Sequence, residues 1–284
     1  MRIQLVTITP KRAMEWLSKS KPNMRNIRQG KTGSLARDMK SGNWIVNGET
    51  IKINPKGELL DGRHRLTACV QSEAVFQSYV AFDVTDDSFA TIDSGSPRTT
   101  GDVLAHRGEQ NARNLAAVLV WIGTLLQTGK MQKFGLTPKK RVFSHTEIIS
   151  ILVDHPGVVD FILPTGGKER YSLSNPSFFA ALRYVTSRID QAKSELFFHQ
   201  VQRGEGLTAR DPAFVLRKRL IESRSNQVSK MPLKYECAII IKAWNTFYTN
   251  SPAPKFYRLN SDTEEFPDIA GWDGNKGEEE LPPL

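Results

Sequence analysis

Three basic or protonatable side chains follow an Asp-Gly dipeptide directly, in the stretch Asp61-Gly62-Arg63-His64-Arg65. The apolar pair Leu59-Leu60 before it is typical of a short strand that enters a core, and Asp-Gly favours a tight turn. From Leu66 the apolar residues recur at helical spacing. A helix N-terminus with guanidinium groups beside it binds anions, because main-chain N–H groups and the helix dipole point outward there. The stretch Gly62–Arg65 therefore predicts a phosphate or polyphosphate site.

Two carboxylates and one imidazole near this turn are the candidate catalytic groups. Asp61 has two open interpretations. In the first, its carboxylate accepts main-chain N–H groups of its own turn. In the second, it has a chemical role, either to position a divalent ion or to act as a base. Glu49 follows Asn47-Gly48 just before a predicted strand, and is a candidate general base or metal-directed ligand. His64 lies between two arginines, which disfavours its protonation, so it either acts as a neutral donor or acceptor or only supports the turn.

A second loop of small residues, Asp93 to Gly101, precedes a predicted helix. Arg98, Thr99 and Thr100 could form a second phosphate-contacting surface there. The alternative is that Thr99 or Thr100 caps the helix while Arg98 is solvated. No group of His, Cys, Asp and Glu has the spacing of a metal site, and no Walker loop, Gly-x-Ser-x-Gly or dinucleotide fingerprint occurs in the sequence.

The motif Leu60-Asp61-Gly62-Arg63-His64-Arg65-Leu66, with Asn47-Gly48-Glu49-Thr50-Ile51 before it, resembles the strand-turn-helix signature of the ParB/sulfiredoxin superfamily. The layout is most similar to uncharacterised phage and mobile-element proteins with a ParB N-terminal-like domain. The resemblance covers about residues 7–100, and it implies a small mixed sheet with helices and a nucleotide-binding role.

The superfamily includes partition proteins, nucleases, small-molecule kinases and a redox repair enzyme, so the resemblance alone does not choose a reaction. The redox enzymes carry a cysteine where this chain has Arg63, which excludes that activity. Partition proteins have a Gly-Glu-Arg-Arg turn and an adjacent helix-turn-helix reader, and neither is evident here. In the kinases a carboxylate activates a hydroxyl, and by resemblance alone Glu49 would take that role.

The charge balance favours a polyanionic partner. The chain of 284 residues has 39 Lys and Arg and 30 Asp and Glu, a net charge of +9. Residues 261–284 contain eight acidic side chains and one lysine, so the first 260 residues carry +16. Such a basic body fits nucleic acid. No apolar run is long enough to span a membrane, and no signal peptide is evident. Only two cysteines occur. We therefore expect a cytoplasmic protein, in the host cytoplasm if a phage encodes it.

The expected fold class is α+β, with a small mixed sheet in residues 1–100, an all-α domain in 101–250 and a loosely packed or disordered tail, rich in Pro, Gly and acidic residues, in 251–284. Trp44–Val46, Ile51–Ile53, Glu58–Leu60 and Gln77–Val84 are expected to be strands, the middle two as a hairpin. Pro10–Ser18 and Ser34–Lys40 are expected to be helices, and Ser144 to Glu147 fits a capping box.

Together these patterns predict a protein that binds nucleotide or DNA phosphates and acts in DNA metabolism by phosphate-ester cleavage or transfer, as a nuclease or NTPase. A nucleoside triphosphate with Mg²⁺ is the expected cofactor pair. Two alternatives stay open: a binding module for DNA or protein without catalysis, and an ATP-dependent kinase for a small molecule or nucleotide.

Overall fold

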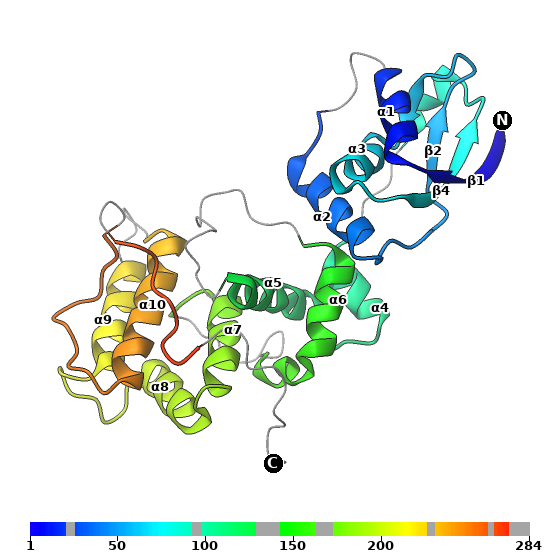
Figure 1. The fold of residues 1–284 in the computed structure, drawn as a ribbon. Coiled ribbons are helices and arrows are strands. Elements are labelled where there is room, and N and C mark those ends of the chain that lie inside the picture. The colour runs from blue at the N-terminus through cyan, green and yellow to red at the C-terminus, as the bar shows by residue number, and fades with distance from the viewer. Residues whose placement is uncertain are drawn as a thin grey trace. The chain divides into compact units, whose positions relative to one another are not determined.

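The chain divides into two compact units in the computed structural model, which describes residues 1–20, 26–92, 98–128, 143–162, 173–225, 231–260 and 264–272 (Figure 1). Unit 1 is Met1–Thr99 with the later segment Arg141–Glu147, and unit 2 is Thr100–Lys140 with Ile148–Leu284. The first division falls next to residue 100, where the sequence placed a domain boundary.

Unit 1 is a mixed four-stranded sheet with helices, in agreement with the expected α+β class. The strand order is β1-β4-β2-β3, in which β4 and β2 are parallel and the other two pairs are antiparallel. Its elements are β1 (Arg2–Ile8), α1 (Pro10–Ser18), α2 (Gln29–Lys40), β2 (Thr50–Ile53), β3 (Leu59–Asp61), α3 (Arg63–Ser72), β4 (Phe76–Phe82) and a 3₁₀-helix (Asp86–Thr91).

The core of unit 1 lies between one face of the sheet and its three α-helices. Buried side chains from the strands, among them Ile51 and Val80, pack with Ala13 of α1, Met39 of α2 and Leu66 of α3. A smaller cluster around Leu60 and Ala81 lies apart from this core. All three helices therefore belong to the same layer, which Figure 1 shows beside the strands.

Two local expectations for unit 1 were wrong. Trp44–Val46 is not a strand; Trp44 instead donates from Nε1 to the carbonyl of Gln77 at 2.8 Å and contacts the Phe76 ring edge-on, so a side chain fixes this segment. The second helix begins at Gln29 and not at Ser34, which adds a first turn that contains Gly30. Helix Pro10–Ser18 and the hairpin are confirmed, with Thr9 capping α1.

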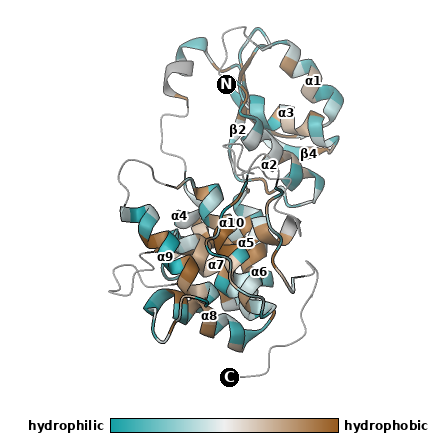
Figure 2. Cartoon of the chain, turned by 90° about the vertical axis from the view of Figure 1, so that its left-hand side faces the viewer, coloured by the Kyte–Doolittle hydropathy of each residue, from teal (hydrophilic) through white to brown (hydrophobic). Residues whose placement is uncertain are grey.

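Unit 2 is helical and buries an aromatic core. It contains α4 (Thr100–His106), α5 (Ala112–Thr128), all but the first turn of α6 (His145–Asp154), a 3₁₀-helix (Pro156–Phe161), α7 (Pro176–Ser187), α8 (Gln191–Arg203), α9 (Pro212–Ser225) and α10 (Leu233–Tyr248). Phe178, Phe197 and Trp244 are fully buried, and Figure 2 shows the apolar residues concentrated on helices such as α5, α7 and α10. None of the helices described has the length and apolar character that spanning a bilayer requires.

The segment after α10 corrects the expected tail. Residues 251–260 and 264–272 are not loosely packed, because Tyr257, Leu259, Phe266 and Ile269 are buried. Asn245 of α10 holds this segment with two hydrogen bonds, donating to the Asp268 carbonyl at 2.7 Å and accepting from the Ala270 N–H at 2.8 Å. The remainder of the expected tail lies outside the described residues.

The first turn of α6 belongs to unit 1 and is a capping box, as the sequence predicted. The Glu147 N–H donates to Ser144 Oγ at 3.1 Å, and the Ser144 N–H donates to Glu147 Oε2 at 2.8 Å. Helix α2 binds both residues: Arg37 donates twice to the Glu147 carboxylate, at 2.6 and 3.0 Å, and Ser144 Oγ donates to Asp38 at 2.7 Å. Burial raises the pKa of the Asp38 carboxyl, although the Ser144 hydroxyl opposes this.

Candidate functional site

The turn between β3 and α3 depends on a glycine. Gly62 has φ +104°, a conformation that side chains rarely adopt, and it is buried. A Cβ at this position would lie 2.7 Å from Cγ1 of Ile51, which is itself fully buried in β2. The chain can therefore turn directly from the strand into the helix here only because residue 62 has no side chain.

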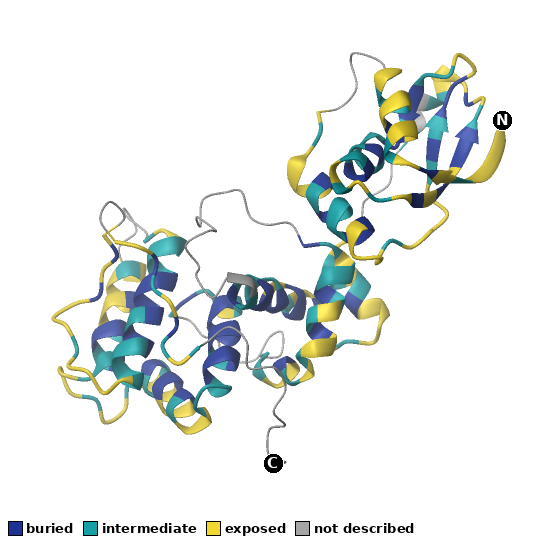
Figure 3. Cartoon of the chain, in the orientation of Figure 1, coloured by how far each residue is buried: buried dark blue, intermediate teal, exposed yellow. Residues whose placement is uncertain are grey.

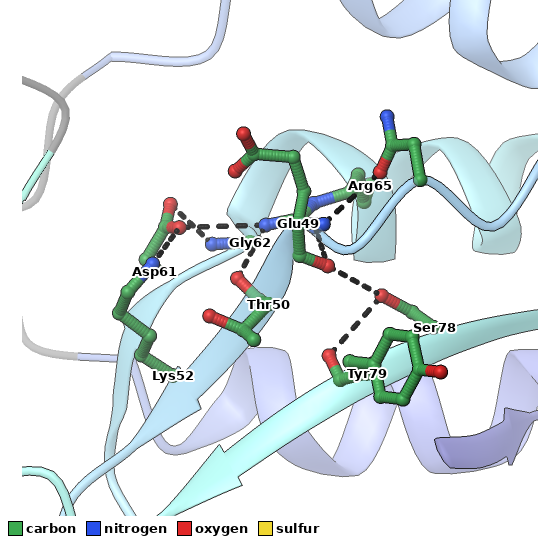
Figure 4. A network of polar contacts seen from close by, with 9 residues as sticks. Glu49, Thr50, Lys52, Asp61, Gly62, Arg65, Ser78 and Tyr79 are labelled. Carbon is green, nitrogen blue, oxygen red and sulfur yellow. Dashed lines mark hydrogen bonds and ion pairs between the residues drawn. The ribbon is translucent and has the colours of Figure 1, made fainter. Parts of the chain in front are cut away.

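Asp61 is held by its own turn and by two cations (Figure 4). Its Oδ1 accepts the Gly62 N–H at 2.6 Å, and its Oδ2 contacts Lys52 Nζ at 3.2 Å and Arg65 Nη2 at 3.4 Å. Of the two open interpretations of Asp61, the structure shows the first. Because both oxygens already have cationic or N–H partners, this carboxylate does not fit a Mg²⁺ ion held by the protein.

Arg65 connects α3 to the start of β2. Its guanidinium donates to the carbonyls of Glu49 at 3.1 Å and Thr50 at 2.8 Å, and its side chain is only 14% exposed. The sequence predicted a phosphate site over Gly62–Arg65, which includes both arginines. The structure instead directs the Arg65 fork to the protein itself, and Arg63, the first residue of α3, is half-buried.

Glu49 contributes to this network through its main chain. Its carbonyl accepts from Arg65 and from Ser78 Oγ at 3.4 Å, and its N–H donates to Asn47 Oδ1 at 3.1 Å. The carboxylate is on an exposed residue and points away from the labelled contacts in Figure 4. Glu49 and Asp61 therefore do not form a pair of facing carboxylates.

His64 connects the start of α3 to the start of α2. Its Nε2 accepts the main-chain N–H of Arg28 at 3.1 Å, and Arg28 is the residue that precedes α2. An accepting Nε2 carries no proton, so the imidazole in this arrangement is neutral with its proton on Nδ1. This hydrogen bond joins two segments that are 36 residues apart in the sequence.

Two helix N-termini thus converge at His64. The first main-chain hydrogen bond of α2 is Thr32 N–H to the Arg28 carbonyl, and that of α3 is Leu66 N–H to the Gly62 carbonyl. Neither helix has an acidic residue in its first turn. Cationic side chains occur at both starts instead, namely Arg28 and Lys31 on α2 and Arg63 and Arg65 on α3. We call this convergence the α2–α3 corner.

The contribution of α2 to this corner was not predicted from the sequence. The apolar spacing of Leu35 and Met39 predicted a helix only from Ser34, and Gly30 and Gly33 lower the helix propensity of the turns before it. The signal that was available is the cluster of cations before Ser34, of which Arg28 contacts His64 of α3.

The residues of the second predicted surface lie where unit 1 ends and unit 2 begins along the sequence. Arg98 and Thr99 are exposed and end unit 1, while Thr100 is the first residue of α4 in unit 2. Thr99 thus occupies the N-cap position of α4, which fits the capping alternative. The contacts that build the α2–α3 corner come from Arg28 and from residues 49–65.

Cys69 follows on α3 and is not a candidate nucleophile. Its thiol is buried and donates to the Ala74 carbonyl at 3.1 Å, and burial raises the pKa of the thiol to about 11. A thiol with this pKa stays protonated near neutral pH, and the protonated form is unreactive.

Comparison with protein-family models, with curated proteins and with solved structures finds no match to this chain. The resemblance to the ParB/sulfiredoxin superfamily therefore depends only on the two sequence motifs, Asn47–Ile51 and Leu60–Leu66.

Proposed function

We propose that unit 1 binds a phosphate group of a nucleotide or nucleic acid at the α2–α3 corner. The observation that carries the proposal is the convergence of two helix N-termini without a carboxylate in either first turn. A cation at a helix N-terminus is unfavourable by about 0.3–1 kcal/mol, because it faces the positive end of the dipole. Arg28, Lys31 and Arg63 carry this cost together, and an anion bound between the two helix starts would reverse it.

The internal contacts of the corner favour binding over catalysis. Asp61 is neutralised by Lys52 and Arg65, and His64 uses Nε2 to support α2. These residues hold the shape of the corner, which suits a preformed anion site. Phosphate-ester cleavage or transfer in DNA metabolism, which the resemblance implies, would need a general base other than Asp61.

The proposal is tested by removing two of the three corner cations that do not contact Asp61, which are Arg28, Lys31 and Arg63. We expect the Lys31→Ala, Arg63→Ala double variant to weaken binding of a nucleoside triphosphate, pyrophosphate or a short oligonucleotide by at least about tenfold, since two charge-assisted contacts are lost. Lys56→Ala, at an exposed position in the β2–β3 turn, is the control and should bind as the unmodified protein does.

Calorimetry and thermal shift of the full chain, with and without Mg²⁺, measure this binding. The proposal is contradicted if none of the three ligands binds the unmodified protein, or if the double variant binds as well as Lys56→Ala. Turnover of a bound triphosphate in the unmodified protein that is lost in Glu49→Gln would instead favour the kinase alternative.

A further inference from the structure

The charges of unit 1 are separated by layer. The described residues of the helical layer, 10–20, 26–40 and 63–72, contain nine cationic and two acidic side chains, a net charge of +7. Residues 1–9, 41–62 and 73–92, which supply β1, β2, β3, β4 and their connections, contain three cationic and seven acidic side chains, a net charge of −4. Because α1, α2 and α3 cover the same face of the sheet, the positive charge of unit 1 is concentrated in that layer, while the strands and their connections are net acidic.

Several cations of the helical layer have no carboxylate partner in the part of the chain that the structure describes. Lys19 pairs with Glu15, and Arg37 pairs with Glu147. The other exposed cations of this layer that lack such a partner are Lys11, Arg12, Arg28, Lys31 and Lys40, and Figure 3 shows the exposed outer residues of α1 and α2. Exposed like charges repel one another, so a surface of this kind favours a partner with opposite charge.

The length of this basic surface indicates whether its ligand is a single phosphate group or a polymer of phosphates. Lys31 and Arg28 lie at the start of α2 and Lys40 at its end, and a helix of 12 residues is about 18 Å long. A bound triphosphate concentrates its charge at one point. Duplex DNA carries about one charge per 1.7 Å of axis, so about ten phosphates lie along that length. Lys11 of α1 adds a further cation that the corner does not contain.

We infer that the ligand of unit 1 is a nucleic-acid strand that lies across the helical layer of α1, α2 and α3, with one of its phosphates at the α2–α3 corner. This inference rests on the proposed function and names its substrate class. The contacts are to the sugar-phosphate backbone, so binding is independent of base sequence. The net negative charge of the strands and their connections repels the same polymer, which favours binding at the helical layer.

The test reverses two charges of the layer that lie outside the corner. In the full-length Lys11→Glu, Lys40→Glu variant we expect DNA affinity to fall by about tenfold at moderate salt. The slope of log affinity against log salt should become smaller by about 1.8 for duplex and about 1.4 for single-stranded DNA. Lys56→Glu, Lys255→Glu is the matched control, since it changes net charge equally at exposed positions and should leave both quantities close to those of the unmodified protein.

Fluorescence anisotropy with a short duplex and the corresponding single strand, between about 50 and 200 mM salt, gives these values. Equal loss of affinity in both variants would overturn the inference, because net charge and not the layer would then control binding. A second outcome would overturn the inference and keep the proposed phosphate site at the α2–α3 corner. In that outcome the Lys11→Glu, Lys40→Glu variant binds DNA as the unmodified protein does, while the Lys31→Ala, Arg63→Ala variant loses pyrophosphate binding. Loss of DNA binding in the layer variant without any effect of the corner variant supports the surface and rejects the corner.

Discussion

Replacement of Gly62 by alanine is predicted to destabilise unit 1 by about 2–5 kcal/mol. Part of this is the cost of φ +104°, about 1–2 kcal/mol for a residue with a Cβ. The rest is steric, because the new Cβ would lie 2.7 Å from Cγ1 and 3.1 Å from Cγ2 of Ile51. Ile51 is fully buried in β2 and cannot turn away, and overpacking of this kind costs about 1–3 kcal/mol.

Gly57→Ala is the matched control for this change. Gly57 also has a positive φ, +78°, but a Cβ there meets no heavy atom within 4 Å. Its replacement should therefore cost only the backbone term, about 1–2 kcal/mol. In an Ile51→Ala background most of the steric part of the Gly62→Ala cost should disappear, because only the 3.2 Å contact to Cβ of residue 51 is left, and a double-mutant cycle should give a coupling energy of about 1–3 kcal/mol.

Native-state hydrogen exchange of the β2 and α3 amides, read as a function of urea, reports the stability of unit 1 separately from that of unit 2. The reasoning is refuted if Gly62→Ala and Gly57→Ala reduce protection of these amides to the same extent. It is also refuted if the cycle shows no coupling between positions 62 and 51.

Three further outcomes follow from buried groups. Burial raises the pKa of the Asp38 carboxyl in the folded chain, so the folded state binds this proton more tightly than the unfolded state, and the free energy of unfolding falls as pH rises through that pKa. Asp38→Asn should lack this part of the pH dependence in urea unfolding. As pH decreases from 7, the unmodified protein should therefore become more stable relative to the variant. Burial also raises the pKa of both the Cys69 and Cys237 thiols, so iodoacetamide at pH 7 should modify them only after denaturation, as mass spectrometry would show. Asn54 is 2% exposed, and its Oδ1 accepts from the N–H groups of Lys56 at 3.0 Å and Glu58 at 2.8 Å. Asn54→Ala should therefore lower the free energy of unfolding in urea by about 1–3 kcal/mol. An unchanged free energy of unfolding would show that the turn forms without these hydrogen bonds.

Short-range signals predicted much of unit 1. Thr9-Pro10 marked the start of α1, the Asn54–Gly57 turn marked the hairpin, and Ser144 with Glu147 marked the start of α6. In each case the residues that specify the element are its neighbours in the sequence, and their hydrogen bonds close within four residues.

The partners of the candidate site could not be predicted, because they come from distant parts of the chain. Arg65 belongs to a helix start that the sequence identified, but its acceptors are carbonyls 15 and 16 residues earlier. His64 bonds to Arg28 across 36 residues, and the helix that follows Arg28 was hidden by its glycines. The tail was misread for a similar reason: the apolar residues Tyr257 and Phe266 have no periodic spacing, and only their packing beside α10 reveals them.

The capping box of α6 makes unit 1 discontinuous along the gene. A fragment that ends near residue 99 would leave the Asp38 carboxyl without its donor Ser144 and the Arg37 guanidinium without its acceptor Glu147. During synthesis the last contacts of the N-terminal unit therefore wait until Glu147 has emerged from the ribosome, by which time α4 and α5 have already been made. Recombination that exchanges only the first hundred codons would separate the Glu147 carboxylate from its donor Arg37.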